Sequence, residues 1–261
     1  MVNKVKEVLR QQKDIKMKNS FYHISQIKFA YNSNHMEGSK LSEEQTELIF
    51  KTNTVLPTSE NEVINVDDLI ETRNHFTLFD YLLDHADETL TAEQVKTFHK
   101  ILKSNTQDAQ RDWFRVGEWK KLPNVIGTDT ETVAPENVEK EIQNLLKMYD
   151  KKTDKTFEDI IDFHVKFERI HPFQDGNGRV GRAIMFKECL KNNVFPFIVL
   201  DERKAFYYRG LKEYDREPGY ILETCRYFQD IYKETFDKMI GKYLDDNSSK
   251  EVEFSKDERE L

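Results

Sequence analysis

The chain has few of the residues that interrupt helices. Its 261 residues include only 9 glycines and 6 prolines, about half the roughly 12% that these two residues contribute to an average protein. Residues that favour helices, above all Lys, Glu and Leu, are frequent instead. The composition therefore predicts a mainly helical protein.

Cysteine pairs and long apolar runs are also missing. The two cysteines, Cys189 and Cys225, lie far apart and form no C-x-x-C, so neither a disulfide framework nor a zinc knuckle fits. The longest apolar run, 194–200, contains Pro196 and is too short to span a bilayer. Residues 1–20 are charged and have no apolar core of a signal peptide. We expect a cytoplasmic protein without a membrane partner.

An excess of positive charge is absent too. With 40 Lys and Arg against 48 Asp and Glu, the formal net charge is −8. An acidic chain repels phosphate backbones, which argues against a general nucleic-acid binder. The 18 Phe and 11 Tyr are enough for a sizeable core and exclude disorder throughout.

Apolar residues at helical spacing predict a series of helices joined by short turns. Ser20 and Thr91 are suited to be N-caps, Ser42 and Gln45 form a capping box, and Gly38 is a helix stop. The expected helices are 1–19, 21–36, 43–51, 63–87, 92–103, 135–148, 157–170, 180–190, 204–214 and 219–243.

One segment breaks the helical pattern. Between Trp113 and Val133, β-branched residues stand among Gly117, Pro123 and Gly127, which predicts a β-hairpin. We expect an all-α fold in three parts. These are N-terminal helices over 1–62, a core domain over 63–243 with the hairpin at about 113–134, and a charged tail over 244–261.

Residues 171–182, HPFQDGNGRVGR, carry the chemistry. Glycines free backbone N–H groups to face a ligand, and the helix that follows offers its positive N-terminus. Arg179 and Arg182 are three positions apart and share one side of that helix. Between 164 and 182, four Lys or Arg face two Asp or Glu, a local reversal of the chain's charge. The segment predicts an anion site for a di- or triphosphate.

Two further side chains suit phosphate chemistry. Asp175 offers a hard oxygen ligand for a Mg²⁺ ion that is shared with phosphates. His171 can accept a proton near neutral pH.

This string resembles the signature of Fic-domain proteins, H-x-F-x-[D/E]-G-N-G-R-x-x-R, and fills every defining position, including Phe173. The resemblance covers about residues 63–230. It implies an all-α Fic core with a β-hairpin flap. It also implies transfer of AMP from ATP to a Tyr, Thr or Ser hydroxyl of a protein target or of the chain itself.

The resemblance also assigns roles to residues of the motif. His171 would deprotonate the target hydroxyl, and Asp175 would hold Mg²⁺ on the α- and β-phosphates. Arg179 would contact the phosphates, and Arg182 the γ-phosphate. The anion hole would consist of Gly176, Asn177 and Gly178.

Other residues follow from the same resemblance. In the flap, Val125, Ile126 and Gly127 would pair with the backbone of a target. Tyr208 and Asp215 would lie near ribose and adenine, although many relatives have Asn in place of Asp215. Phe173 would anchor the loop in the core. We interpret His164 as a structural histidine with its hydrogen bonds satisfied.

A second motif lies near the N-terminus. Residues 33–38, SNHMEG, are similar to the family's inhibitory motif, [S/T]-x-x-x-E-[G/N]. The similarity implies that Glu37 enters the active site and pairs with Arg182. ATP would then bind in an unreactive pose.

Three alternatives remain open at this point. The same fold could transfer UMP or phosphocholine, or remove AMP with Glu37 activating a water. The chain could be an ATP-sensing regulator without catalysis, or a phosphohydrolase built on His171 and Asp175. Arg182 argues against the phosphohydrolase and His171 against a pure sensor. The sequence leaves the target protein open and is compatible with a homodimer.

Overall fold

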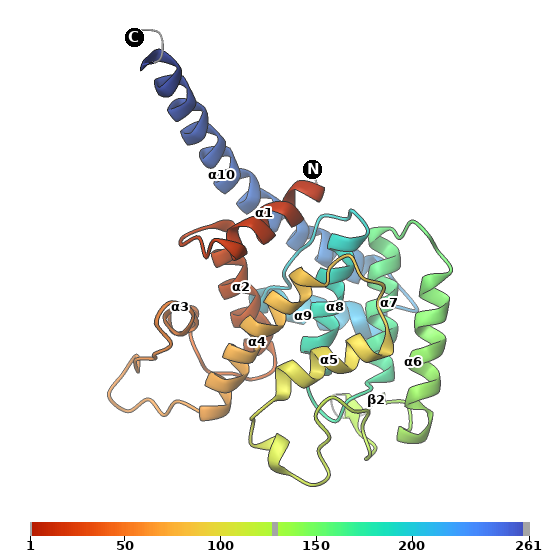
Figure 1. Ribbon diagram of the computed structural model, residues 1–261. Coiled ribbons are helices and arrows are strands. Elements are labelled where there is room, and N and C mark those ends of the chain that lie inside the picture. Colours follow the sequence, from red (N-terminus) through yellow and green to blue (C-terminus); the bar gives the residue numbers. More distant parts are fainter. Residues whose placement is uncertain (1, 127–129, 258–261) are drawn as a thin grey trace.

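A computed structural model of the chain describes residues 2–126 and 130–257 (Figure 1). It is mainly helical, and its elements follow in this order: α1 Val2–Asp14, α2 Phe21–Met36, α3 Glu43–Thr52, α4 Val66–Asp84, α5 Ala92–Lys103, the 3₁₀ helix η1 Asp108–Gln110, β1 Val125–Ile126, β2 Thr130–Glu131, α6 Pro135–Asp150, α7 Phe157–Ile170, α8 Asn177–Lys191, the 3₁₀ helix η2 Asp201–Arg203, α9 Lys204–Glu213 and α10 Gly219–Asp257. The all-α prediction is confirmed.

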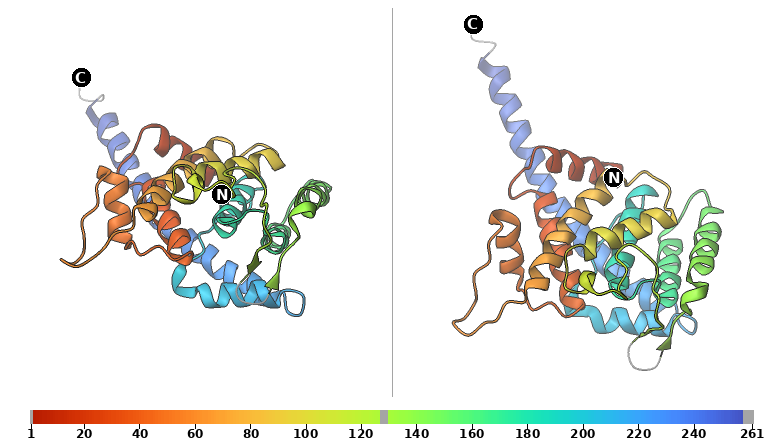
Figure 2. Two further views of the ribbon diagram at one scale, coloured as in Figure 1. Left: turned by 90° about the horizontal axis from the view of Figure 1, so that it is seen from below. Right: turned by 60° about the horizontal axis from the view of Figure 1, so that its bottom comes forward.

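The helix α8 lies at the centre of the bundle. It contacts α7 on one side and α4 and α5 on the other, and α1 and α2 also reach it (Figures 1 and 2). All residues from Arg179 to Leu190 are buried. A helix that is buried all round has no solvent face, so the polar groups on α8 must find partners on its neighbours.

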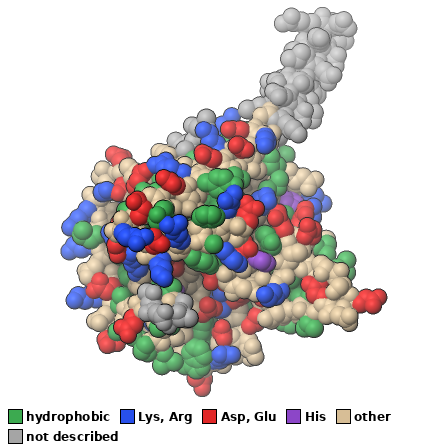
Figure 3. All heavy atoms as spheres, turned by 180° about the vertical axis from the view of Figure 1, so that it is seen from behind, with side chains coloured by type: hydrophobic (Ala, Val, Ile, Leu, Met, Phe, Trp, Pro, Cys, Tyr) green, Lys and Arg blue, Asp and Glu red, His purple; other side chains and the backbone are tan. Residues whose placement is uncertain are grey.

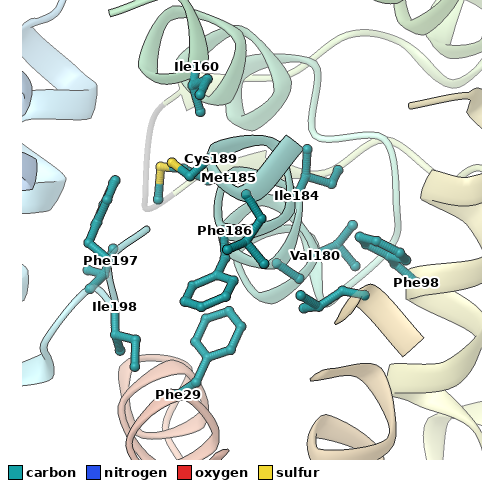
Figure 4. Packing of buried hydrophobic residues seen from close by; sticks show 14 of the residues in the cluster. Phe29, Phe98, Ile160, Val180, Ile184, Met185, Phe186, Cys189, Phe197 and Ile198 are labelled. Carbon is teal, nitrogen blue, oxygen red and sulfur yellow. The ribbon is translucent and has the colours of Figure 1, made fainter. Parts of the chain in front are cut away.

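An aromatic cluster joins three helices of this core. Phe29 of α2 stacks on Phe186 of α8 with ring centroids 5.4 Å apart, and Phe79 of α4 lies 5.6 Å from Phe29 and 5.3 Å from Phe186. Figure 4 shows Phe29 and Phe186 face to face. The first half of α2 is therefore part of the main core.

The predicted caps form as the sequence indicates. Ser20 and Thr91 accept hydrogen bonds from backbone N–H groups of the turn that follows, and Ser42 and Gln45 form a capping box. Because these signals are local, they fix where α2, α3 and α5 begin.

Some boundaries differ from the prediction. The helix α4 begins at Val66 rather than at residue 63, because Asn65 caps it. The helix α8 begins at Asn177 rather than at 180, because Gly176 turns the chain with a φ of +80°. The helix α10 continues past Tyr243 to Asp257, through a stretch that contains no glycine or proline.

The predicted hairpin is present but short. Val125 pairs with Glu131 and Ile126 with Thr130 in an antiparallel register. Gly127, the third predicted flap residue, lies outside the described residues. Val125 is exposed.

The surface carries charges of both signs. On the face in Figure 3, Lys and Arg side chains are interspersed with Asp and Glu. Within the described part of the chain, every helix is too short or too polar to cross a membrane.

The crossing of α9 and α10 requires Gly210. A Cβ at this position would lie 2.7 Å from the backbone N and Cα of Ile221. We expect Gly210→Ala to destabilise the fold by about 1–3 kcal/mol through overpacking, and thermal melting should show a fall of several degrees.

Gly241→Ala is the matched control. No atom lies within 4 Å of a Cβ at this helical position, so the substitution should stabilise the helix by roughly 0.5–1 kcal/mol. An equal melting temperature for the two variants would contradict the crossing argument.

Candidate active site

His171 ends α7 in a left-handed conformation, with φ 52° and ψ 61°. Its backbone N–H donates to the carbonyl of Phe167 at 3.0 Å, and its Nδ1 lies 3.2 Å from the carbonyl oxygen of Glu168. Because a carbonyl only accepts, Nδ1 carries the proton of the neutral ring. The lone pair is then on Nε2, which makes this atom the proton acceptor.

The surroundings of His171 favour its neutral form. Burial lowers the pKa of His171, the carbonyl of Glu168 opposes this shift, and the ammonium group of Lys120 adds to it. Lys120 is itself held by the side chains of Asn124 and Thr132, at 2.7 and 2.6 Å. The imidazole is therefore ready to accept a proton at neutral pH.

The loop after His171 is braced by Asn177. Its Oδ1 accepts from the backbone N–H of Phe173 at 2.7 Å, and its Nδ2 donates to the carbonyl of Phe173 at 2.8 Å. Phe173 is buried and stacks on His99 with ring centroids 4.0 Å apart. The side chain of Asn177 thus holds the loop in shape, and Phe173 is the expected core anchor.

His99, which the sequence analysis did not single out, joins this loop to the segment before the hairpin. Its Nδ1 accepts from the N–H of Gly117 at 2.9 Å, so its Nε2 carries the proton and donates to the carbonyl of Asp175 at 3.2 Å. Burial lowers the pKa of His99 to about 3, with a contribution from Lys103. The ring stays neutral, and its two bonds are fixed.

Four charged side chains are linked by ion pairs around the loop before α8. We call them the Asp175 cluster: Glu71, Lys103, Asp175 and Arg179. Oδ2 of Asp175 lies 2.6 Å from Nζ of Lys103 and 3.2 Å from a guanidinium nitrogen of Arg179. Glu71 pairs with the same two cations, at 2.5 Å from Lys103. Burial opposes ionisation of Asp175, but Arg179 and Lys103 outweigh it and hold its pKa well below the usual range.

Arg182 faces the N-terminal helix α2. Its Nε donates to the hydroxyl of Ser33 at 2.9 Å, and one NH2 group donates to the carbonyl of Ser33 at 2.9 Å and to Oε1 of Glu37 at 2.7 Å. The guanidinium is buried, and the carboxylate of Glu37 pairs with it across 145 sequence positions. Burial opposes the charge of Arg182, but Glu37 raises its pKa above the usual value.

The carboxylate of Glu37 also lies at the N-terminus of α8. A Cβ on Gly178 would overlap Oε1 of Glu37 and lie 2.9 Å from a guanidinium nitrogen of Arg182. Glu37 therefore occupies the position that a helix N-terminus offers to an anion.

Gly181 makes room for two buried side chains of α7. A Cβ there would overlap Oε1 of Glu168 and lie 2.9 Å from His164. His164 bonds to the hydroxyl of Tyr207 through Nε2, but its Nδ1 has no partner among the described residues, so its hydrogen bonds are only half satisfied. Burial raises the pKa of Glu168 to about 8.

The two residues expected near ribose and adenine lie at the surface. The hydroxyl of Tyr208 donates to the carbonyl of Met36 at 3.3 Å, next to Glu37. Asp215 is exposed and pairs with Arg169 at 2.9 Å. Tyr208 thus contacts the N-terminal helix, whereas Asp215 is held by α7.

Glu71, Lys103 and His99 could not be recognised from the sequence, because their partners in the site are distant along the chain. No pattern within α4 or α5 marks them, apart from a His and a Lys on an otherwise apolar helix face.

The side chains of this site could hold a metal only together with phosphate oxygens of a substrate. Among the described residues, no three His, Cys, Asp or Glu side chains gather closely enough to hold a metal. Magnesium is commonly bound by one or two carboxylates plus substrate phosphates, and Asp175 offers a half-exposed carboxylate of that kind.

A family model matches the part of the chain that carries the hairpin and the histidine loop. Residues 89–189, which include the whole 171–182 motif, match the Fic/DOC family. This segment of the chain is therefore similar to a Fic domain.

Named relatives extend the likeness. The chain is 25% identical over 190 residues to protein adenylyltransferase fic-1 of Caenorhabditis elegans, covering 70% of this chain and 35% of that protein. It is 24% identical over 219 residues to protein adenylyltransferase Fic of Nematostella vectensis, covering 81% and 48%. The chain thus spans less than half the length of either relative.

A solved structure shares the fold. A Fic domain containing signaling protein from Bacteroides thetaiotaomicron superposes with a TM-score of 0.69 at 23% identity, covering 89% of this chain and 92% of that chain. The likeness extends well beyond residues 89–189 and includes most of the helical bundle.

Gly178 offers a test of the contact between Glu37 and Arg182. We expect Gly178→Ala to push the carboxylate of Glu37 away from the guanidinium of Arg182. The new Cβ would crowd Oε1 of Glu37 and a guanidinium nitrogen of Arg182. Losing a charge-assisted hydrogen bond of about 1.5–3 kcal/mol should speed amide hydrogen exchange over residues 33–38 roughly tenfold or more. Gly241→Ala serves as the control, and unchanged exchange in Gly178→Ala would contradict the contact.

Proposed function

We propose that this chain is a protein adenylyltransferase that transfers AMP from ATP to a Tyr, Thr or Ser hydroxyl of a target protein and of itself. We further propose that Glu37 holds it inactive. One observation carries the proposal. His171, with the lone pair of its neutral ring on Nε2, lies in the loop that leads into the N-terminus of a helix bearing two buried arginines.

The residues present suit an in-line transfer. The target oxygen would form a bond to the α-phosphorus while the bond to pyrophosphate breaks, and the hydroxyl proton would pass to Nε2 of His171. Backbone N–H groups at the N-terminus of α8 and the guanidinium of Arg179 would stabilise charge on the phosphate oxygens. A general base contributes about 10²–10⁴-fold to such a rate.

Magnesium, held by Asp175 together with the phosphates, would neutralise charge on the triphosphate. The chain's own part is to orient the carboxylate of Asp175, and Lys103 and Arg179 do so through one of its oxygens. This supports the role that the motif assigns to Asp175.

Inhibition follows from competition for one guanidinium. A γ-phosphate that bound Arg182 would have to displace the carboxylate of Glu37 at 2.7 Å. The same carboxylate covers the start of α8 at Gly178. The contact from Tyr208 to Met36 holds the end of α2 in place, so the helix and the nucleotide would compete for overlapping space.

The relatives support AMP transfer at the level of the family. Two of them are named protein adenylyltransferases. This chain spans less than half the length of each relative. The proposed activity therefore rests on the residues of its own site.

The sharpest test of inhibition is Glu37→Gly. We expect transfer of label from α-labelled ATP to rise roughly tenfold or more, since each 1.4 kcal/mol of blocking removed changes the competent fraction about tenfold. The substitution is at a helix end next to Gly38, so the melting temperature should change little. Parent and variant are compared at equal concentration, with γ-labelled ATP as the negative control.

His171→Ala in the Glu37→Gly background separates the role of His171 as a general base from inhibition by Glu37. Transfer should be lost while ATP binding persists, because other residues hold the phosphates. Equal transfer by parent and Glu37→Gly would refute the inhibition. A lower rate in Glu37→Gly would point to AMP removal with Glu37 activating water.

The pH profile tests the neutral form of His171. Its pKa lies below the ordinary 6.5, and the neutral ring is the active form. Transfer by Glu37→Gly should therefore persist as pH falls through 6.5 and be lost only at lower pH. The measurement is kcat/KM from about pH 5 to about pH 9.

Lys120→Met should move the acidic limb of this profile to higher pH, because Lys120 helps to lower the pKa of His171. Lys121→Met, at an exposed neighbouring position, should leave the limb in place. A limb centred above pH 6.5 in Glu37→Gly would contradict a neutral base.

A further inference from the structure

Lys103 lies among three carboxylates and is almost fully buried. Its Nζ is 2.5 Å from Glu71, 2.6 Å from Asp175 and 3.7 Å from Asp108, and only 3% of its side chain is exposed. Lysine is seldom buried this deeply unless it is paired. The ammonium group joins α4, α5, the 3₁₀ helix η1 and the loop before α8 at one point.

The position of Lys103 matters because it bonds to the residue that would hold a metal. Among the described residues, both ion pairs of Asp175 use Oδ2, one with Lys103 and one with Arg179. The carboxylate is still 46% exposed. A structural lysine at the end of α5 would need Glu71 alone, so the bond to Asp175 calls for a different explanation.

The charges of the side chains around Asp175 explain the bond between Lys103 and Asp175. Glu71, Asp108 and Asp175 carry three negative charges, and Lys103 and Arg179 carry two positive charges. Without Lys103, the group would present a charge of −2 around a half-exposed carboxylate, which attracts a divalent cation. With Lys103 in place, an ammonium lies within hydrogen-bonding distance of the same carboxylate and repels that cation.

A triphosphate would change this balance. It brings several negative charges of its own, and on the proposed function it would draw Arg179 away from Asp175 to a phosphate. The cation would then meet Asp175 in company with phosphate oxygens, whose charge offsets that of Lys103.

We propose that Lys103 is a positioning residue that acts as the internal counter-ion of Asp175. It keeps this carboxylate closed to a free divalent cation, so that the metal enters only together with a nucleoside triphosphate. The second half of this statement rests on the proposed function, whereas the first half concerns the nucleotide-free protein alone.

The test measures metal binding rather than transfer. Mn²⁺, whose free form gives an electron paramagnetic resonance signal, is titrated into the full chain without nucleotide. The parent should bind Mn²⁺ only weakly. Lys103→Met, which keeps the length of the side chain but removes its charge, should bind at least ten times more tightly. Asp175→Asn added to Lys103→Met should abolish the gain and so locate the ion.

Two controls separate this role from a general effect. Lys103→Arg restores the charge and should return Mn²⁺ affinity to that of the parent. Lys100→Met removes one positive charge at an exposed position on the same helix and should leave the affinity unchanged. An equal gain in Lys100→Met would overturn the proposal, because net charge alone would then explain it.

Folding is checked by thermal melting. If Lys103→Met is unfolded, it is replaced by the double variant Lys103→Met with Glu71→Gln. This double variant removes both charges of the ion pair between Lys103 and Glu71. It still frees Asp175 of its ammonium and should still bind Mn²⁺ more tightly than the parent. Parent-like Mn²⁺ affinity in folded Lys103→Met, or in the double variant if it is the protein that folds, would overturn the proposal.

A second titration, with an ATP analogue that cannot be cleaved, tests the nucleotide part. The analogue should raise Mn²⁺ affinity much more in the parent than in Lys103→Met, which is already open to the ion. An equal gain in both proteins would overturn this part. Tight Mn²⁺ binding by Lys103→Met, together with no transfer by Glu37→Gly, would refute the proposed function and leave the role of Lys103 standing.

Discussion

The buried guanidinium of Arg182 ties the N-terminal helix to the centre of the fold. A buried charge without partners is strongly destabilising, and α2 supplies three acceptors from one turn: the hydroxyl and carbonyl of Ser33 and the carboxylate of Glu37. On the proposed function, an anion of the substrate would replace Glu37 when the last turn of α2 leaves. The N-terminus of α8 would then exchange one charged partner for another.

The helix α2 is held by different kinds of contact along its length. Its first half is anchored in the core by Phe21 and by the stack of Phe29 on Phe186. Its last two turns bury Asn32, Ser33 and Asn34 as well as Met36, and the Oδ1 atom of Asn34 has no partner among the described residues. A polar contact costs less to expose to water than an apolar one. The end of α2 is thus held by polar contacts as well as by Met36, whereas Phe21 and Phe29 hold the rest of the helix through aromatic packing.

The sequence predicted what local chemistry determines. Capping residues such as Ser20 and Ser42 located the helix starts, and the 171–182 motif located the loop. It did not indicate that Lys103 would meet Asp175, since that contact depends on how α5 packs against α8. Nor could it show that the side chain of Asn177 would brace the loop through the backbone of Phe173. Such roles depend on tertiary neighbours and not on spacing along the chain.

The charged side chains of the site are paired with one another. Glu37 pairs with Arg182, and Lys103 pairs with Asp175, the carboxylate that would hold a metal on the proposed function. Each pair removes the cost of an uncompensated buried charge. A lone cation would be repelled by the ammonium group of Lys103. A lone anion would be repelled by the carboxylate of Glu37. On the proposed function, a metal-bound triphosphate would replace both partners at once, so that the complete substrate would compete best with these two pairs.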